Sequence, residues 1–216
     1  MFWTHLFLPC LDCDRLPPMD ILPWFAPEVL SRWESRSVHP RSQQGPTARA
    51  HHDRHRRIVA VEPAGPPQPQ GAFERVAESI LHYRIFPLQV GTPVLADSVC
   101  KGATVGLRYR LLPGLHLFFA SRVVDVFEHR SEELWRSGFT YQTLVGHPEV
   151  GEETFWVEKN LTSGAVEAGL QAWSELNFAW LRPFEPLCRW LQLSAGRSAL
   201  DYLEQVANAS AANPVL

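Results

Sequence analysis

The sequence contains few cysteines, and they do not form a pattern. Four cysteines are spread over 216 residues, which is too few and too scattered for a disulfide framework. Cys10 and Cys13 form a single CxxC pair, and His5 is the only nearby histidine. Structural zinc needs four ligands, and a redox CxxC pair lies between a strand and a helix. We therefore interpret the pair as incidental and expect no metal and no cofactor.

Long apolar runs are also absent. No stretch approaches the roughly 18 apolar residues that form a membrane-spanning helix. The first residues, MFWTHLFLPCL, are apolar, but they lack the basic start of a signal peptide and Pro9 interrupts them. We therefore expect no membrane span and predict a cytoplasmic location.

The sequence signatures of several enzyme classes are missing. There is no G-x-G-x-x-G, no phosphate loop, no H-E-x-x-H and no G-x-S-x-G. The chain is 45% hydrophobic and 20% charged, so it can bury an ordinary globular core. Its eight Trp and twelve Phe either fill that core or line an apolar cavity, and both interpretations stay open.

Charge is distributed unevenly along the chain. The formal net charge is −3, but the stretch Ser31–Arg57 holds seven Arg against Glu34 and Asp53, so it carries +5 and the remainder −8. Basic arms of this kind bind nucleic acid or anionic lipid, or extend into solvent. Because no aromatic residue lies between the arginines after Trp33, stacking on bases lacks support. We expect no nucleic-acid partner.

Residues 1–56 form a Pro/Arg-rich extension that we expect to be partly disordered. Its prolines leave room for one short helix over Pro27–Arg36. The apolar side chains there that we expect to dock on the main domain are Trp24, Phe25, Val29, Leu30 and Trp33. We expect Ser37–Arg57 to be mobile because it has little to bury. The His51–His55 tract is a weak metal site because arginines flank it.

A single α+β domain is predicted over residues 57–210. Apolar side chains at helical spacing predict a helix over Ala72–Phe86, which Pro87 ends. Five strands are then expected over Ala103–Leu112, Leu115–Glu128, Leu134–Leu144, Glu152–Lys159 and Ala165–Ser174. Their short connections favour an antiparallel meander. A helical region follows over Phe178–Ala207, bent near Pro183 and Pro186 and broken near Gly196. The prediction is a curved antiparallel sheet wrapped around a long C-terminal helix, with a cavity between them.

The densest group of polar side chains lies in GFTYQTLVGHPEVGEETF, residues 138–155. Gly146 permits positive φ and Pro148 restricts His147, so a sharp turn is expected there. Alternation along the following strand places Glu153 and Phe155 on one face. Tyr141 on the preceding strand lies within cross-strand reach.

Three interpretations of this group stay open. In the first, His147 and a glutamate form a general acid–base pair, in which the carboxylate fixes the imidazole and raises its pKa toward neutrality. In the second, His147, Glu149 and Glu153 bind a divalent metal. In the third, the segment is a structural loop whose carboxylates satisfy main-chain N–H groups and pair with Arg108, Arg110, Arg122 or Arg136.

Several segments of the chain resemble uncharacterised protein family 0548, which occurs in bacteria and plants. The matching pieces are AFERVA (72–77), YRIFP (83–87), RVVDV (122–126) and GFTYQTL running into GHPExGEExF (138–155). The resemblance covers about Gly71 to Val206. It implies a relative of the START-like helix-grip superfamily, whose members bind lipids, steroids and polyketides or cyclise them. The family implies no particular activity.

We therefore expect a protein that binds a small apolar metabolite between the sheet and the C-terminal helix. The side chains expected to line the cavity are Phe118, Phe139, Phe155 and Trp173. Those expected to offer polar or catalytic contacts at its mouth are Tyr141, His147, Glu149 and Glu153, with His147 as the base in an enzyme. The alternative is a ligand-free interaction protein with a filled core and a basic tail that recruits a partner. Neither the ligand, a reaction nor the oligomeric state follows from the sequence.

Overall fold

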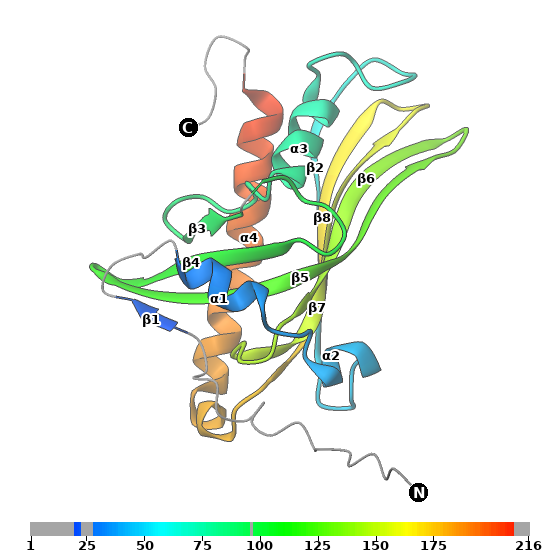
Figure 1. The fold of residues 1–216 in the computed structure, drawn as a ribbon. Helices are drawn as coiled ribbons and strands as arrows, with labels where there is room; N and C mark the ends of the chain where they lie inside the picture. The colour runs from blue at the N-terminus through cyan, green and yellow to red at the C-terminus, as the bar shows by residue number, and fades with distance from the viewer. Residues whose placement is uncertain (1–19, 23–27, 96, 210–216) are drawn as a thin grey trace, which may run out of the picture.

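The computed structural model describes residues 20–22, 28–95 and 97–209 (Figure 1). Its centre is one antiparallel sheet in the spatial order β2-β8-β7-β6-β5-β4-β3, with the short β1 pairing with β5. The strands are β1 Asp20–Leu22, β2 His51–Val61, β3 Gly91–Val94, β4 Thr104–Leu112, β5 Leu115–Arg130, β6 Leu134–Thr143, β7 Glu149–Asn160 and β8 Ala165–Leu176. The sequential pairing from β4 to β8 confirms the predicted meander.

Local sequence explains the turns of this meander. Gly114, between β4 and β5, has φ +77°, a value that glycine adopts without steric cost. Between β7 and β8, the Asn160 side chain accepts hydrogen bonds from the amides of Thr162 and Ser163, and Gly164 has φ +75°. An added Cβ at Gly164 would lie 1.8 Å from the carbonyl oxygen of Glu62. Both turns therefore depend on glycine.

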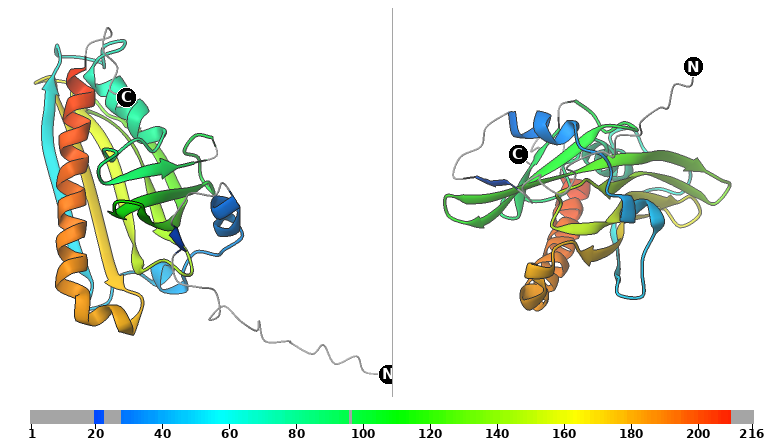
Figure 2. Two further views of the ribbon diagram at one scale, coloured as in Figure 1. Left: turned by 90° about the vertical axis from the view of Figure 1, so that its left-hand side faces the viewer. Right: turned by 60° about the horizontal axis from the view of Figure 1, so that its bottom comes forward.

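Two helices lie against the curved sheet, as Figure 2 shows. They are α3, Ala72–Leu81, and α4, Glu185–Asn208, which follows the short 3-10 helix η2, Ala179–Phe184. The sheet curls around α4, which packs beside β2 and β8, while α3 packs on β6 and β7. The α+β arrangement of a curved antiparallel sheet around a long C-terminal helix is therefore as predicted.

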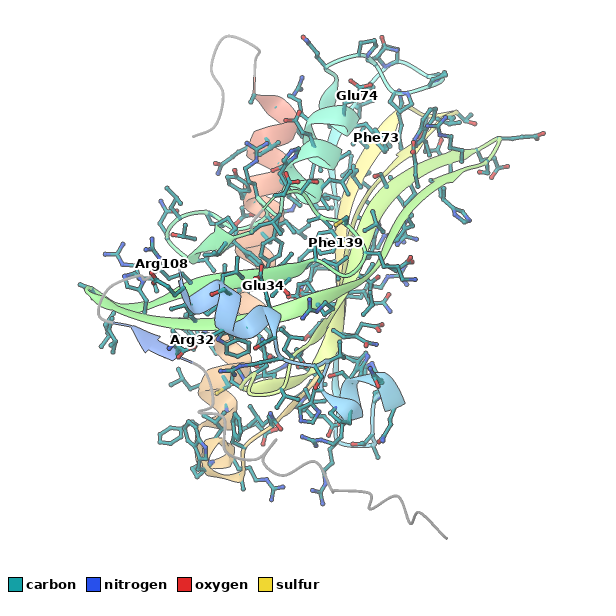
Figure 3. All side chains as sticks on the ribbon, in the orientation of Figure 1. Arg32, Glu34, Phe73, Glu74, Arg108 and Phe139 are labelled. Atoms are coloured by element: carbon teal, nitrogen blue, oxygen red, sulfur yellow. The ribbon has the colours of Figure 1, made fainter. Side chains whose placement is uncertain are left out.

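The main core fills one end of the space between the sheet and the helices. Phe73, labelled in Figure 3, extends from α3 and meets Trp135 edge-on, with ring centroids 6.4 Å apart. Phe139, also labelled there, packs against Phe155 at 5.7 Å. The second half of α4 contributes buried side chains such as Leu203. The first half of α4 borders a cavity, with Cys188, Leu191 and Gln192 in its wall.

The two predicted helices differ from the observed ones in detail. α3 ends at Leu81 rather than Phe86, because Tyr83 has φ +55° and the Arg84 amide bonds the Ser79 carbonyl, which turns the chain inward. Helix α4 runs without a break through Gly196. A Cβ at Gly196 would lie 3.3 Å from the His55 ring, so this glycine permits α4 to approach β2.

The N-terminal region is more structured than its composition indicates. The described part contains helix α1, Glu28–Glu34, and helix α2, Pro40–Gln44. Val29, Leu30 and Trp33 are buried as predicted, whereas Trp24 and Phe25 lie outside the described residues. Val29, Leu30 and Trp33 pack with Phe118 in a second apolar cluster.

The structure differs from two expectations about the segment Ser37–Arg57. We expected this segment to be mobile, and we expected the folded domain to start only near Arg57. The stretch contains α2 and most of β2. Its backbone pairs with β8, and its arginines find acidic partners: Arg56 with Glu158 and Glu167, and Arg57 with Asp201 and Glu204. Polar side chains thus hold the strand in place where apolar ones are lacking.

Candidate functional site

A cavity of about 250 Å³ lies between the sheet and the first half of α4. Most of its wall is apolar. The apolar residues that border it include Phe86, Leu107, Tyr109, Leu117, Phe119, Leu170, Leu176, Leu181 and Leu191. The acidic residues lie on β2 and β7, and further polar side chains come from β6, β8, α4 and the turn before β7.

Strand β7 supplies the acidic wall through its two-residue alternation. Glu149, Gly151 and Glu153 fall at alternate positions, and all three border the cavity. A Cβ at Gly151 would lie only 2.2 Å from the Trp173 carbonyl oxygen. Glycine is therefore needed for the close approach of β7 to β8, and it leaves no side chain between the two glutamates.

Glu153 and Tyr141 form a hydrogen-bonded pair. They lie directly opposite each other on β7 and β6, and the Tyr141 hydroxyl donates to Oε2 of Glu153 at 2.5 Å. Burial raises the pKa of Glu153 to about 7, against the lowering effect of the Tyr141 hydroxyl. Burial and the nearby Glu153 charge raise the pKa of Tyr141. A carboxyl group with a pKa near neutrality suits proton transfer as well as ligand contact.

Glu149 faces α4 rather than His147. Burial raises the pKa of its carboxyl group, while a hydrogen bond from Gln192 and the charge of Arg189 lower it. Gln192 also donates to the Ser174 hydroxyl at 3.0 Å. The Arg189 guanidinium forms a two-pronged ion pair with Asp53 of β2.

His147 has a main-chain partner, not a carboxylate. Its Nδ1 lies 3.0 Å from both the amide nitrogen and the carbonyl oxygen of Glu149. Nδ1 accepts the amide hydrogen in one tautomer of the ring and donates to the carbonyl oxygen in the other. The ring also meets Phe119 edge-on at 4.8 Å.

The electrostatic state of His147 differs from the acid–base interpretation. Burial lowers the pKa of this imidazole to about 3, whereas a carboxylate partner was expected to raise it toward neutrality. A neutral imidazole with so low a pKa is a weak base at pH 7. The Asn177 side chain bonds the His147 carbonyl oxygen at 2.9 Å, so the residue also holds the turn together.

Five of the eight predicted site residues border the cavity, and three do not. Those that border it are Tyr141, His147, Glu149, Glu153 and Trp173. Phe139 and Phe155 are fully buried in the main core, directly paired across β6 and β7. Phe118 lies on the opposite face of β5, under α1, and its neighbour Phe119 borders the cavity in its place.

The sequence-based prediction missed the contributions of β2 and α4. Asp53 and His55 border the cavity from β2, and Cys188 and Gln192 border it from α4. The sequence offered no signal for this part of β2, because His51–Arg57 is polar throughout and lacks apolar–polar alternation. Only in the structure does exposure alternate, from His51 to Ile58.

The third interpretation, in which the loop's carboxylates pair with arginines, has little support. Arg122 donates to the carbonyl oxygens of Gly102, Glu34 and Arg36. Arg136 pairs with Glu158.

Within residues 20–22, 28–95 and 97–209, no group of three or more His, Cys, Asp or Glu side chains is arranged to hold a metal ion. In the same part of the chain, no helix has the length and hydropathy of a membrane span.

The fold is a curved antiparallel sheet around a long C-terminal helix, with a cavity between them. Residues 34–202 match the family model described as a domain of unknown function (DUF1990). The chain belongs to this family. No curated protein matches it.

Solved structures of similar architecture are distant in sequence. The hypothetical protein jhp0584 from Helicobacter pylori is 10% identical with a TM-score of 0.49, covering 81% of this chain and 96% of that one. Truncated norcoclaurine synthase from Thalictrum flavum is 10% identical with a TM-score of 0.41, covering 74% and 95%. A START superfamily protein from Mycobacterium smegmatis is 9% identical with a TM-score of 0.38, covering 71% and 98%.

Proposed function

We propose that this protein binds a small, largely apolar metabolite in the cavity between the sheet and α4. The observation that carries the proposal is the combination of an apolar wall with a few polar groups on one side. That combination is typical of small-molecule sites. Tyr141, Glu149 and Glu153 would orient the ligand, while Phe119 and Leu191 would cover its apolar body.

Native mass spectrometry of freshly purified protein, beside a denatured control, tests the proposal. We expect a bound mass that leaves on denaturation. Ala172→Leu should abolish it, because Ala172 borders the cavity opposite both Asp53 and Glu153. Ala179→Leu makes the same change at an exposed position outside the cavity wall and should keep the bound mass.

Thermal unfolding gives a second readout. A ligand at 100 times its dissociation constant stabilises the folded state by about 2.7 kcal/mol. A bound mass that survives in Ala172→Leu, or the lack of any bound mass together with no thermal shift from apolar candidates, would contradict the proposal.

The alternative, a ligand-free interaction protein with a recruiting basic tail, finds less support. It requires a filled core and free arginines. Arg32, Arg41, Arg56 and Arg57 instead form ion pairs with acidic side chains of this chain. The cytoplasmic location stays a prediction.

A further inference from the structure

The cavity wall contains charge of one sign. Among the described residues, four carboxylates border it, Asp53, Glu149, Glu152 and Glu153, and no Lys or Arg does. Arg189, whose charge acts on Glu149, is held by Asp53 in their two-pronged ion pair. Glu152 accepts a hydrogen bond from the Gln142 amide at 2.9 Å. Glu149 and Glu153 therefore face the cavity without a dedicated cation.

Small residues form a floor between these carboxylates. Ala172 of β8 lies between Glu153 and Asp53 in one cross-strand row, so these two Cα atoms are about 10 Å apart. Glu149 and Glu153 are separated by about 13 Å along β7, with Gly151 midway. Because Gly151 and Ala172 carry almost no side chain, a ligand group can lie between the three acids.

His147 is an independent sign that this wall meets a ligand. The residue is only 7% exposed and borders the cavity. Within the described residues, its Nε2 has no hydrogen-bond partner, whereas Nδ1 is bound by the Glu149 main chain. In either tautomer this ring nitrogen can exchange a hydrogen bond with a polar group of a ligand.

We propose that the ligand carries a protonated amine, which lies over Gly151 and Ala172 and pairs with Glu149 and Glu153. This inference rests on the proposed function and names the class of ligand. The same wall disfavours a carboxylate or phosphate, because an anion would face buried acids with no cation free to receive it. The raised pKa values of Glu149 and Glu153 agree with this, since a cationic partner would restore their charged form.

Three probes that share a phenylalkyl body test the inference: 2-phenylethylamine, 2-phenylethanol and 3-phenylpropionate. Their affinities are measured by isothermal titration calorimetry at pH 8, where the amine is protonated and an ordinary imidazole is neutral. We expect the amine to bind about 10- to 100-fold more tightly than the alcohol, the range for a hydrogen bond to a charged group. The carboxylate should bind most weakly.

Isosteric variants locate the preference. Glu149→Gln and Glu153→Gln should each reduce the affinity for the amine more than that for the alcohol, so that the ratio of the two affinities falls. Glu158→Gln is the matched control, because Glu158 lies on the same strand and pairs with Arg56 away from the cavity. It should retain the full preference for the amine.

The outcomes separate this inference from the proposed function. If the alcohol binds and the amine gains nothing, or the carboxylate binds best, the amine inference is wrong and the cavity still binds apolar molecules. If none of the probes binds to the wild type and the purified protein contains no bound mass, both are overturned.

Discussion

Among the single residues, Glu153 has the clearest consequence for solution behaviour. Its carboxyl group faces the cavity beside Tyr141, and burial holds its pKa at about 7 instead of the ordinary 4.5. Between these two pH values the folded protein keeps a proton that the unfolded chain has released. The free energy of unfolding therefore falls as pH rises through this window.

We predict that Glu153→Gln removes this decrease. The stability advantage of the variant over the wild type should grow as pH rises from about 4.5 to 7. At pH 8 it should amount to about 1–3 kcal/mol of unfolding free energy. Urea denaturation of both proteins at several pH values measures the difference. His147, whose lowered pKa acts in the opposite direction, is present in both proteins and cancels in the comparison. A difference that stays constant from pH 5 to pH 8 would contradict the prediction.

The candidate cluster could be located from the sequence, but its electrostatics could not. Tyr141 was expected on the preceding strand within cross-strand reach of this segment, and it pairs with Glu153. The pKa shifts depend on burial beneath α4, which starts more than 30 residues later. A local pattern contains no measure of that burial, which is why the expected rise in the pKa of His147 is a lowering instead.

Among the elements, the connection from β2 to α3 depends on a buried ion pair. Lys159 of β7 is fully buried, and its Nζ donates to Glu62 Oε2 at 2.8 Å and to the Pro66 carbonyl oxygen at 2.9 Å. Glu62 also accepts the Phe73 amide at the start of α3. Burial alone would raise the pKa of Glu62, but these hydrogen bonds lower it.

We predict that Lys159→Met destabilises the protein by about 3–5 kcal/mol, because it leaves a buried carboxylate without its cation. The double variant Lys159→Met/Glu62→Gln should recover part of the loss, since the remaining side chain is neutral. Urea denaturation at pH 7 measures both. A single variant that loses less than about 1 kcal/mol would show that the pair contributes little.

Which side chains of a strand face α4 was harder to predict than the position of the strand in the sequence. Phe118 and Phe119 are adjacent and equally apolar, and alternation alone does not say which one faces α4. The choice follows from α1, which covers Phe118 with Trp33. An irregularity in the pairing between Val123 and Asp125 changes the register again further along β5.

For the molecule as a whole, the main question is how much of the chain belongs to the folded unit. The family match begins at residue 34, but Trp33 just before it is fully buried. Its indole N–H donates to Asp20 at 2.7 Å, and the Arg36 guanidinium lies 3.9 Å above the ring. Helix α1 is therefore an integral layer on β4 and β5.

We predict that Trp33→Ala costs about 3–5 kcal/mol, the range for a large aromatic removed from a core. Trp180→Ala is the matched control, because Trp180 is 53% exposed and should change stability by less than about 1 kcal/mol. Thermal and urea unfolding compare the two variants. Equal effects would mean that α1 contributes nothing to the fold.

Strand β2 is synthesised well before its partner strand, which affects how it must behave before it is paired. It pairs with β8, which is synthesised roughly 100 residues later, so at 5–20 residues per second it waits about 5–20 s for its partner. An unpaired apolar strand would be prone to aggregate in that interval. We expect the His, Asp and Arg side chains of β2 to keep the unpaired strand hydrated, and in the folded protein Arg56 and Arg57 bind acidic side chains of β7, β8 and α4.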